Sequence, residues 1–276
     1  MRVGIVGCGT ISAAYLKNLT ASADVEVVAC ADQVLERAQE RASEFGVPRA
    51  CDTESLLGDP GVELVVNLTV PTAHAEVTLA ALAAGKHVHS EKPLATNRED
   101  GRRIIDAAKS TGLTVTRGAM AGETIKVTAP TFVAGVLEFE QGAQAVLVNS
   151  FGIAGHDLPH LQVYGSGAIL EVPDPNTFGG PVRVRPNIED APWRELPLRY
   201  RQTETRRDLR GVGLVEAVRA IRKGSQPRAS GELAFHVLDV MLSILESHEN
   251  GRRVTISSTC ARPEPLPLDA GLVAAT

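Results

Sequence analysis

A glycine-rich turn near the start of the chain carries the clearest chemical signal. The run Gly7-Cys-Gly-Thr-Ile-Ser12 follows a short apolar segment and precedes a predicted helix. Glycines in such a turn let the main chain approach a pyrophosphate closely, and the helix offers unpaired N–H groups and a favourable dipole. Ser12 stands where the dinucleotide fingerprint has its third glycine, a position that needs only a small residue. The pattern predicts a dinucleotide site.

An acidic residue at the appropriate distance supports this hypothesis. A second apolar segment, 25–31, ends at Asp32, about 20 residues beyond the turn, where the fingerprint has the acid that binds the adenine ribose. Gln33 follows it rather than a basic residue, and a carboxylate repels a 2′-phosphate. We therefore expect NAD as the cofactor in preference to NADP. The alternative is a glycine turn in another kind of α/β protein, with Asp32 as a helix cap.

Two later segments place polar residues at the edge of the same predicted sheet. The run Asn67-Leu-Thr-Val-Pro-Thr-Ala-His74 follows the fourth predicted strand, and His89-Ser-Glu-Lys-Pro93 follows the fifth. Lys92 is the candidate catalytic residue, because its ammonium can hydrogen-bond a substrate hydroxyl and ease its deprotonation as hydride leaves. A surface lysine in an ion pair is the alternative. His74 either caps its own helix or lines the cofactor site.

Other titratable residues give weaker signals. His87 and His89 alternate on one predicted strand, so we expect structural roles for them. His156, Asp157 and His160 share one predicted loop, where hydrogen-bonded loop histidines are favoured over a metal site. The four cysteines have no metal-binding or redox spacing: Cys8, Cys30, Cys51 and Cys260. We expect no bound metal.

Alternating strands and helices position these residues. Strands are predicted at 2–6, 25–31, 50–51, 64–69, 87–90 and 113–117, and helices at 11–20, 33–45, 53–57, 73–84 and 97–110. Apolar, β-branched strands are typical of a sheet covered on both faces, and the βαβ order predicts a doubly wound parallel sheet. Glycines at 46, 85 and 112 are expected to end helices, and Thr96-x-x-Glu99 is a capping box that would begin the last one.

The pattern changes after Gly118, which we take as the boundary between an α/β domain at 1–118 and an α+β domain at 119–276. Strands of an open, mainly antiparallel sheet are predicted at 125–128, 133–139, 145–151, 161–164 and 168–172, with turns at 140–143 and 165–167. Helices are predicted at 212–223 and 231–248, the second capped by Ser230. The end of the chain, 257–276, is expected to hold a surface strand and a loose tail.

Composition limits the function classes. The 276 residues carry a net charge of −5 with scattered basic residues, which argues against a nucleic-acid partner. No apolar run is long enough to cross a membrane, and the chain begins at once with a strand, so we expect a cytoplasmic protein. The predicted strand 145–151 has apolar residues on both faces, which indicates a homo-oligomer formed through the second-domain sheet.

These motifs resemble those of the Gfo/Idh/MocA oxidoreductases, which include glucose–fructose oxidoreductase and inositol dehydrogenase. The resemblance rests on the glycine turn, on Val70-Pro-Thr-Ala-His74 and on Ala84-Gly-Lys-His-Val-His-Ser-Glu-Lys-Pro93, and it extends over nearly the whole chain. It implies that the Glu-Lys-Pro segment contacts nicotinamide and substrate, and that the loop after the fourth strand contacts the dinucleotide. The predicted cofactor-binding residues are then Gly7, Gly9, Thr10, Ile11, Asp32, Thr69, Val70, Pro71, His74, Glu91, Lys92 and Pro93.

The resemblance implies NAD-dependent transfer of hydride between nicotinamide and a sugar or cyclitol-like polyol. Its alternatives are redox-assisted elimination or glycoside cleavage, and a homologue that binds the cofactor without catalysis. The chain departs from the family after Val115-Thr-Arg-Gly118, where the family has a segment with a helix carrying an Asp and a catalytic His. Here the sheet strands follow directly. The expected acid/base pair is absent, which favours the non-catalytic alternative.

Overall fold

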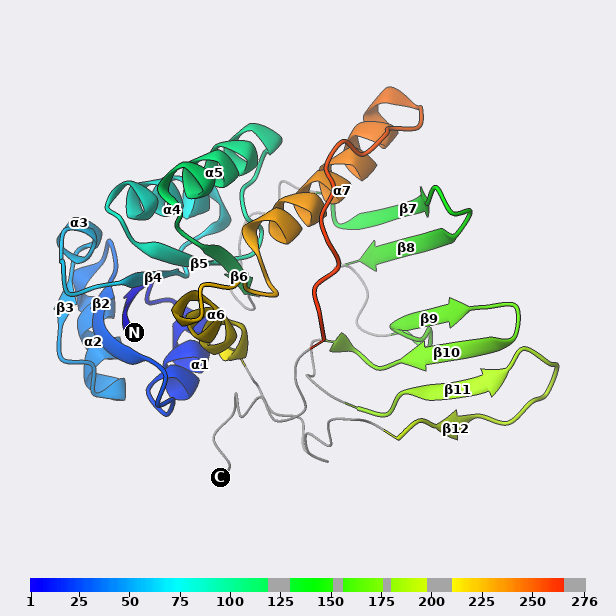
Figure 1. The fold of residues 1–276 in the computed structure, drawn as a ribbon, viewed down its shortest axis with the longest axis horizontal. Helices are drawn as coiled ribbons and strands as arrows, with labels where there is room; N and C mark the ends of the chain where they lie inside the picture. The colour runs from blue at the N-terminus through cyan, green and yellow to red at the C-terminus, as the bar shows by residue number, and fades with distance from the viewer. Residues whose placement is uncertain (119–129, 151–155, 176–179, 198–209, 266–276) are drawn as a thin grey trace. The chain divides into compact units, whose positions relative to one another are not determined.

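The chain folds into two compact units (Figure 1). The first contains Met1–Gly122 and Leu209–Thr276, and the second contains Glu123–Asp208. The computed structural model describes residues 1–118, 130–150, 156–175, 180–197 and 210–265. The last two helices thus group with the first 118 residues, which differs from the expected second domain at 119–276.

A parallel sheet forms the centre of the first unit. Its strands are β1 (Arg2–Val6), β2 (Glu26–Ala31), β3 (Ala50–Cys51), β4 (Leu64–Asn67), β5 (His87–Glu91) and β6 (Val115–Gly118). They lie in the order β3-β2-β1-β4-β5-β6, and all neighbouring pairs are parallel. The predicted doubly wound sheet is confirmed. The strand order reverses between β1 and β4, and ligands of such sheets bind outside the carboxyl ends of the strands at that point.

Helices cover both faces of this sheet, as Figure 1 shows. One face carries α1 (Thr10–Leu19), α2 (Leu35–Phe45) and α6 (Val212–Arg222), whose apolar side chains share one buried cluster with those of β1 and β2. The other face carries α3 (Thr53–Leu57), α4 (His74–Ala83), α5 (Arg98–Thr111) and α7 (Gly231–Asn250), around a second cluster. A short 3-10 turn, Pro71–Ala73, precedes α4.

Ion pairs explain why α6 and α7 belong to the first unit. Arg219 on α6 lies 2.7 Å from the carboxylate of Asp24, and Arg98 on α5 lies 2.7 Å from that of Asp239 on α7. The carboxylate of Asp239 is buried, so removing its partner would leave a buried charge without compensation. Segments far apart in sequence are therefore tied by charge as well as by apolar packing.

Side chains that cap helices match the sequence signals with one correction. Ser230 caps α7 by accepting from the N–H of Leu233, and glycines 46 and 112 end α2 and α5 in the left-handed conformation. The predicted capping box at Thr96 is wrong, because α5 begins one residue later. Asn97 is the cap and accepts from the N–H of Asp100 at 2.8 Å.

The second unit consists of antiparallel strands, as predicted. β7 (Phe132–Glu138) and β8 (Gln144–Ser150) form a hairpin, and β9 (Leu161–Tyr164), β10 (Ala168–Val172), β11 (Arg183–Pro186) and β12 (Arg194–Glu195) form a sheet in the order β12-β11-β10-β9. The predicted strand 125–128 lies outside the described residues. No strand forms in the described part of 257–276. Among the described helices, none has the length and apolar character that crossing a bilayer requires.

Candidate functional site

The glycine turn after β1 packs directly on the main chain that follows β4. Gly7 has a φ of 98°, and a Cβ at this position would lie 2.6 Å from the carbonyl carbon of Leu68. Only glycine fits this contact and this conformation. At Gly9, by contrast, a Cβ would meet no described atom within 4 Å. The turn therefore presents open space on the side of Gly9.

The N-terminus of α1 opens toward that space. Gly9 is its N-cap, no side-chain cap is recorded there, and its first turn has no acidic residue. Thr10 is exposed and Ile11 is buried. Ser12 donates to the carbonyl oxygen of Gly9 at 2.6 Å and accepts from Nε of Arg41 at 3.1 Å. A small polar residue thus fits the third fingerprint position, while the first N–H groups of α1 suit an anion.

Asp32 links the glycine turn to the end of β2. Its Oδ2 accepts from the N–H of Cys8 at 2.7 Å, and its Oδ1 accepts from the N–H of Val34 at 2.9 Å. The N-cap of α2 is Val34 rather than Asp32. The alternative of a simple helix cap is therefore not what the structure contains. Each carboxylate oxygen keeps a second lone pair, so the group can still accept from ribose hydroxyls.

A polar side chain shapes the loop after β4. Oδ1 of Asn67 accepts from the N–H of Thr69 at 3.2 Å and from its hydroxyl at 2.6 Å. The Asn67 amide nitrogen donates to the carbonyl of His74 at 3.0 Å, which closes the loop. Val70 is 59% exposed at its tip, and Pro71 begins the 3-10 turn. The loop therefore offers an apolar surface beside the glycine turn. Gly7 of that turn lies against the main chain of the loop.

His74 connects this loop to the next one. The ring is buried, with Nε2 lying 2.8 Å from the carbonyl oxygen of Thr69 and Nδ1 lying 2.6 Å from that of Pro93. Carbonyl oxygens only accept, so each contact is a hydrogen bond when the facing ring nitrogen carries a proton. The N-cap of α4 is Ala73, with no side-chain hydrogen bond recorded there. His74 therefore holds two loops of the predicted site together rather than capping its helix.

A buried carboxylate lies beside the candidate catalytic lysine. Oε2 of Glu91 accepts from the main-chain N–H of Lys92 at 3.0 Å, and Oε1 accepts from the hydroxyl of Tyr15 at 2.9 Å. Burial raises the pKa of Glu91, while these two donors act to lower it. Lys92 and Pro93 are half-buried. Tyr15 is not among the residues predicted from sequence, where its one signal is a polar-tipped aromatic side chain in the first predicted helix.

His89 extends this polar group. Its Nε2 lies 3.5 Å from the Tyr15 hydroxyl, and the two rings meet edge-on with centroids 5.9 Å apart. Burial lowers the pKa of His89 to about 4, so the ring is neutral at pH 7. Nδ1 of His87 accepts from the N–H of Thr114 at 3.1 Å. Both histidines thus have contacts within the first unit, His87 with the main chain of Thr114 and His89 with the phenol of Tyr15.

The remaining candidate histidines belong to the second unit. The rings of His156 and His160 are 5.2 Å apart, and His160 lies 3.8 Å from the carboxylate of Asp174. Within the described ranges no three His, Cys, Asp or Glu side chains are grouped as metal ligands. The four cysteines are free thiols, and Cys8 and Cys30 are buried.

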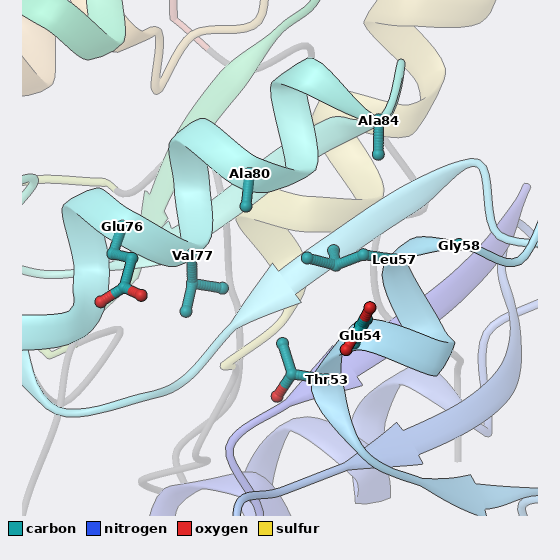
Figure 2. A pocket seen from close by; sticks show the side chains of 8 residues that line it. All are labelled: Thr53, Glu54, Leu57, Gly58, Glu76, Val77, Ala80 and Ala84. Carbon is teal, nitrogen blue, oxygen red and sulfur yellow. The ribbon is translucent and has the colours of Figure 1, made fainter.

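A surface groove of about 440 Å³ lies between α3 and α4 (Figure 2). Leu57, Val77 and Ala80 give it an apolar lining, and the carboxylates of Glu54 and Glu76 belong to the same groove. None of its lining residues is a predicted site residue. The candidate site is therefore the edge formed by the turn after β1 and the loops after β4 and β5.

Comparisons with known proteins match the first part of the chain. Residues 1–119 match a family model described as "Oxidoreductase family, NAD-binding Rossmann fold". The chain is 38% identical over 113 residues to the 1,5-anhydro-D-fructose reductase of Ensifer adhaerens, covering 41% of this chain and 34% of the relative. It is 38% identical over 115 residues to an inositol 2-dehydrogenase of Salmonella typhimurium, again 41% and 34%. The match spans about a third of the length of these curated relatives.

Solved structures resemble the chain over a longer span. An NAD binding oxidoreductase from Klebsiella pneumoniae superposes with a TM-score of 0.77 at 17% identity, covering 94% of this chain and 99% of the other. The UDP-N-acetylglucosamine 3-dehydrogenase of Acidithiobacillus ferrooxidans superposes with a TM-score of 0.72 at 16% identity, covering 88% and 96%. At these identities the likeness establishes the fold of both units and nothing about substrate.

Proposed function

We propose that this chain, whose residues 1–119 match a family model of NAD-binding oxidoreductases, is a Gfo/Idh/MocA-type oxidoreductase that binds NAD and uses Lys92 in the oxidation or reduction of a sugar or cyclitol-like polyol. The observation that carries the proposal is the open glycine turn: an uncapped helix N-terminus, free space at Gly9, and the Asp32 carboxylate hydrogen-bonded to the same turn. These features fit a dinucleotide.

The residues that would hold the dinucleotide come from three segments. The first N–H groups of α1, at Gly9 and Thr10, would bind the pyrophosphate. Asp32 would accept from the ribose hydroxyls, and its charge supports a preference for NAD over NADP. The loop of Thr69, Val70 and Pro71 would contact the dinucleotide, with Val70 supplying exposed apolar surface. Calorimetric titration with both dinucleotides tests the preference, which equal or tighter binding of NADP would overturn.

Lys92 would carry the proton-transfer role. It follows β5 at the carboxyl edge of the sheet, and its main chain is hydrogen-bonded to the buried Glu91 carboxylate. The bound nicotinamide supplies the hydride acceptor or donor. The Lys92 ammonium would donate a hydrogen bond to the substrate oxygen and stabilise the negative charge that develops there as hydride leaves the carbon, with the hydroxyl proton released to water. The substrate class is taken from the printed names of the relatives, a reductase of 1,5-anhydro-D-fructose and a dehydrogenase of inositol.

The second candidate function is cofactor binding with little or no catalysis. The observation that favours it lies in the sequence: the family's helix with an Asp and a catalytic His has no counterpart after Gly118. Turnover against a panel of polyols, measured beside a cofactor titration, separates the two functions. Binding without turnover supports the second, and NAD-dependent turnover that is lost in Lys92→Ala supports the first.

Self-association through the second unit is a further part of the proposal. The β7–β8 hairpin exposes a group of apolar side chains, of which Val146 is 76% exposed and Val148 is 56% exposed. Exposed apolar patches commonly mark interaction surfaces. The occupant we propose is a second copy of the chain. A monomeric mass by light scattering at micromolar concentration would contradict this.

A further inference from the structure

We propose that Tyr15 is a positioning residue for Lys92 and that it acts through the buried carboxylate of Glu91. Tyr15 lies on α1, the helix that begins at the glycine turn, whereas Glu91 and Lys92 end β5. The inference rests on the proposed function of Lys92. It adds a direct physical link between the helix expected to bind the pyrophosphate and the segment expected to act on substrate.

The link consists of two hydrogen bonds to one carboxylate. The Tyr15 hydroxyl donates to Oε1 of Glu91 at 2.9 Å, and the main-chain N–H of Lys92 donates to Oε2 at 3.0 Å. Tyr15 is 1% exposed and Glu91 is 0% exposed, so little water competes for either oxygen. Hydrogen bonds to an ionised group are roughly twice as strong as neutral ones. The carboxylate therefore fixes the main chain of Lys92 relative to α1.

His89 completes the hydrogen-bond chain on the other side of the phenol. Because the Tyr15 proton is donated to Glu91, the phenol oxygen is left to accept, and the Nε2–H tautomer of His89 supplies a donor at 3.5 Å. A phenylalanine at position 15 would fill the same apolar space without these contacts. The polar groups thus serve to hold the carboxylate rather than to fill the core.

Lys92 is held from its other neighbour as well. The carbonyl oxygen of Pro93 lies 2.6 Å from Nδ1 of His74, on the opposite side of the sequence from Glu91. The residues before and after Lys92 are therefore both fixed by buried side chains, and those side chains come from the two other segments of the predicted site. The main chain of Lys92 is thus held between two fixed neighbours, which is the kind of positioning that orientation effects require.

Tyr15→Phe tests the proposal, with Tyr164→Phe as the matched control. The first removes one buried hydroxyl and keeps the ring, and the second makes the same change at a tyrosine of β9 that is 72% exposed. Two readouts need no turnover. They are the titration of Glu91 followed by NMR with carboxyl-labelled glutamate, assigned with Glu91→Gln, and the exchange rate of the Lys92 amide proton.

In Tyr15→Phe the titration midpoint of Glu91 should rise by about one to two pH units, because a donor to the ionised form is lost. The Lys92 amide should exchange about tenfold faster or more, since each 1.4 kcal/mol is tenfold. The control should match the unaltered chain in both. A folded Tyr15→Phe that matches the unaltered chain in both would overturn the proposal.

A double variant keeps the test decisive if folding is disturbed. With Glu91→Gln already present, Tyr15→Phe should have a much smaller effect on the Lys92 amide, because contacting residues are non-additive. An undiminished effect of Tyr15→Phe on the Lys92 amide would show that Tyr15 does not act through Glu91, and it would overturn the proposal. Where turnover exists, Tyr15→Phe should lower kcat about tenfold or more while the Kd for NAD stays within about twofold. Absence of turnover in the unaltered chain would count against the proposed function and leave the two NMR readouts to decide this inference.

Discussion

Gly7 and Leu68 are in direct main-chain contact, since a Cβ on Gly7 would lie 2.6 Å from the carbonyl carbon of Leu68 and 2.7 Å from its oxygen. The turn after β1 and the loop after β4 are thereby joined at the point where the strand order reverses. The same turn is hydrogen-bonded to Asp32 after β2. The cofactor side of the site is therefore an extension of the sheet core. Its two glycines have different roles, since Gly7 is needed for packing and Gly9 leaves space for a ligand.

Gly7→Ala should destabilise the fold. The φ of 98° is unfavourable for alanine, and the new methyl group would overlap the main chain of Leu68. Backbone strain alone costs about 1–3 kcal/mol, and the steric overlap adds to it. Urea unfolding measures the loss. A free energy of unfolding equal to that of the unaltered chain would contradict this, because it would show that the main chain of Leu68 shifts to accommodate the methyl group at little cost.

Gly9→Ala should affect binding instead. Gly9 has an ordinary φ of −72°, and a Cβ there meets nothing within 4 Å among the described atoms. The free energy of unfolding should change by less than about 0.5 kcal/mol. The methyl group would occupy the space that the pyrophosphate needs, so NAD affinity should fall at least about tenfold. Undiminished NAD binding by a stable Gly9→Ala protein would place the phosphates elsewhere.

Asp32→Ala should weaken NAD binding and relax its discrimination against NADP. The variant loses the acceptor for the ribose hydroxyls and the hydrogen bonds to the N–H groups of Cys8 and Val34. Hydrogen bonds to charged groups are worth about 1.5–3 kcal/mol, which predicts about a tenfold to hundredfold rise in the Kd for NAD.

The matched control is Asp52→Ala, which removes the carboxylate that caps α3 by accepting from Ser55. Asp52 is not a predicted site residue, so this change should leave the ratio of NAD to NADP affinity unaltered. Calorimetry on both variants compares the ratios. Equal ratios in the two variants would exclude Asp32 from the discrimination.

His89 should make the fold sensitive to acid. Burial lowers its pKa from 6.5 to about 4, so the unfolded chain binds a proton in a pH range where the folded chain does not. The stability that the neutral ring contributes is fully present above pH 6.5 and is lost as the pH falls toward 4. The loss amounts to about 3 kcal/mol. In His89→Phe, urea unfolding between these pH values should show a shallower decline, and an unchanged slope would contradict the assignment.

The sequence predicted the nucleotide-binding half closely because its signals are local. Strands β1, β2 and β4 are short apolar runs, and glycines 46 and 112 stand where α2 and α5 end in the left-handed conformation. Gly7, Asp32 and Lys92 were placed at one sheet edge by strand order alone, and the structure puts them at the ends of β1, β2 and β5. Spacing and periodicity were sufficient for these features.

Features that depend on tertiary contacts could not be predicted from the sequence. His74 has equal local reasons to cap a helix or face a ligand, and only the positions of Thr69 and Pro93 show that it joins two loops. Tyr15 meets Glu91 across 76 residues of chain, a contact that no local pattern announces. The grouping of α6 with the first unit likewise follows from long-range pairs such as Arg219 with Asp24.

The last prediction follows from the second candidate function, under which the unaltered chain binds NAD yet has little or no dehydrogenase activity. The residues expected to bind the cofactor all precede Gly118, and the contacts described above for Asp32, His74 and Glu91 lie within the first unit. Catalysis needs more, because a positioned acid/base group supplies about 10²–10⁴ in rate and misplacement of substrate costs further orders of magnitude. Lys92 alone would provide part of the proton transfer.

Two proteins test this prediction: the unaltered chain, and a variant with the homologous family segment inserted after Gly118. Both should bind NAD, and the insertion should raise polyol turnover by about 10²-fold or more if it restores the acid/base pair. Substantial NAD-dependent oxidation of a polyol by the unaltered chain, lost in Lys92→Ala, would refute the prediction. Another residue would then have taken over the missing role, and His156→Ala and Asp157→Ala, made in the loop where both residues lie, would be the first variants to measure.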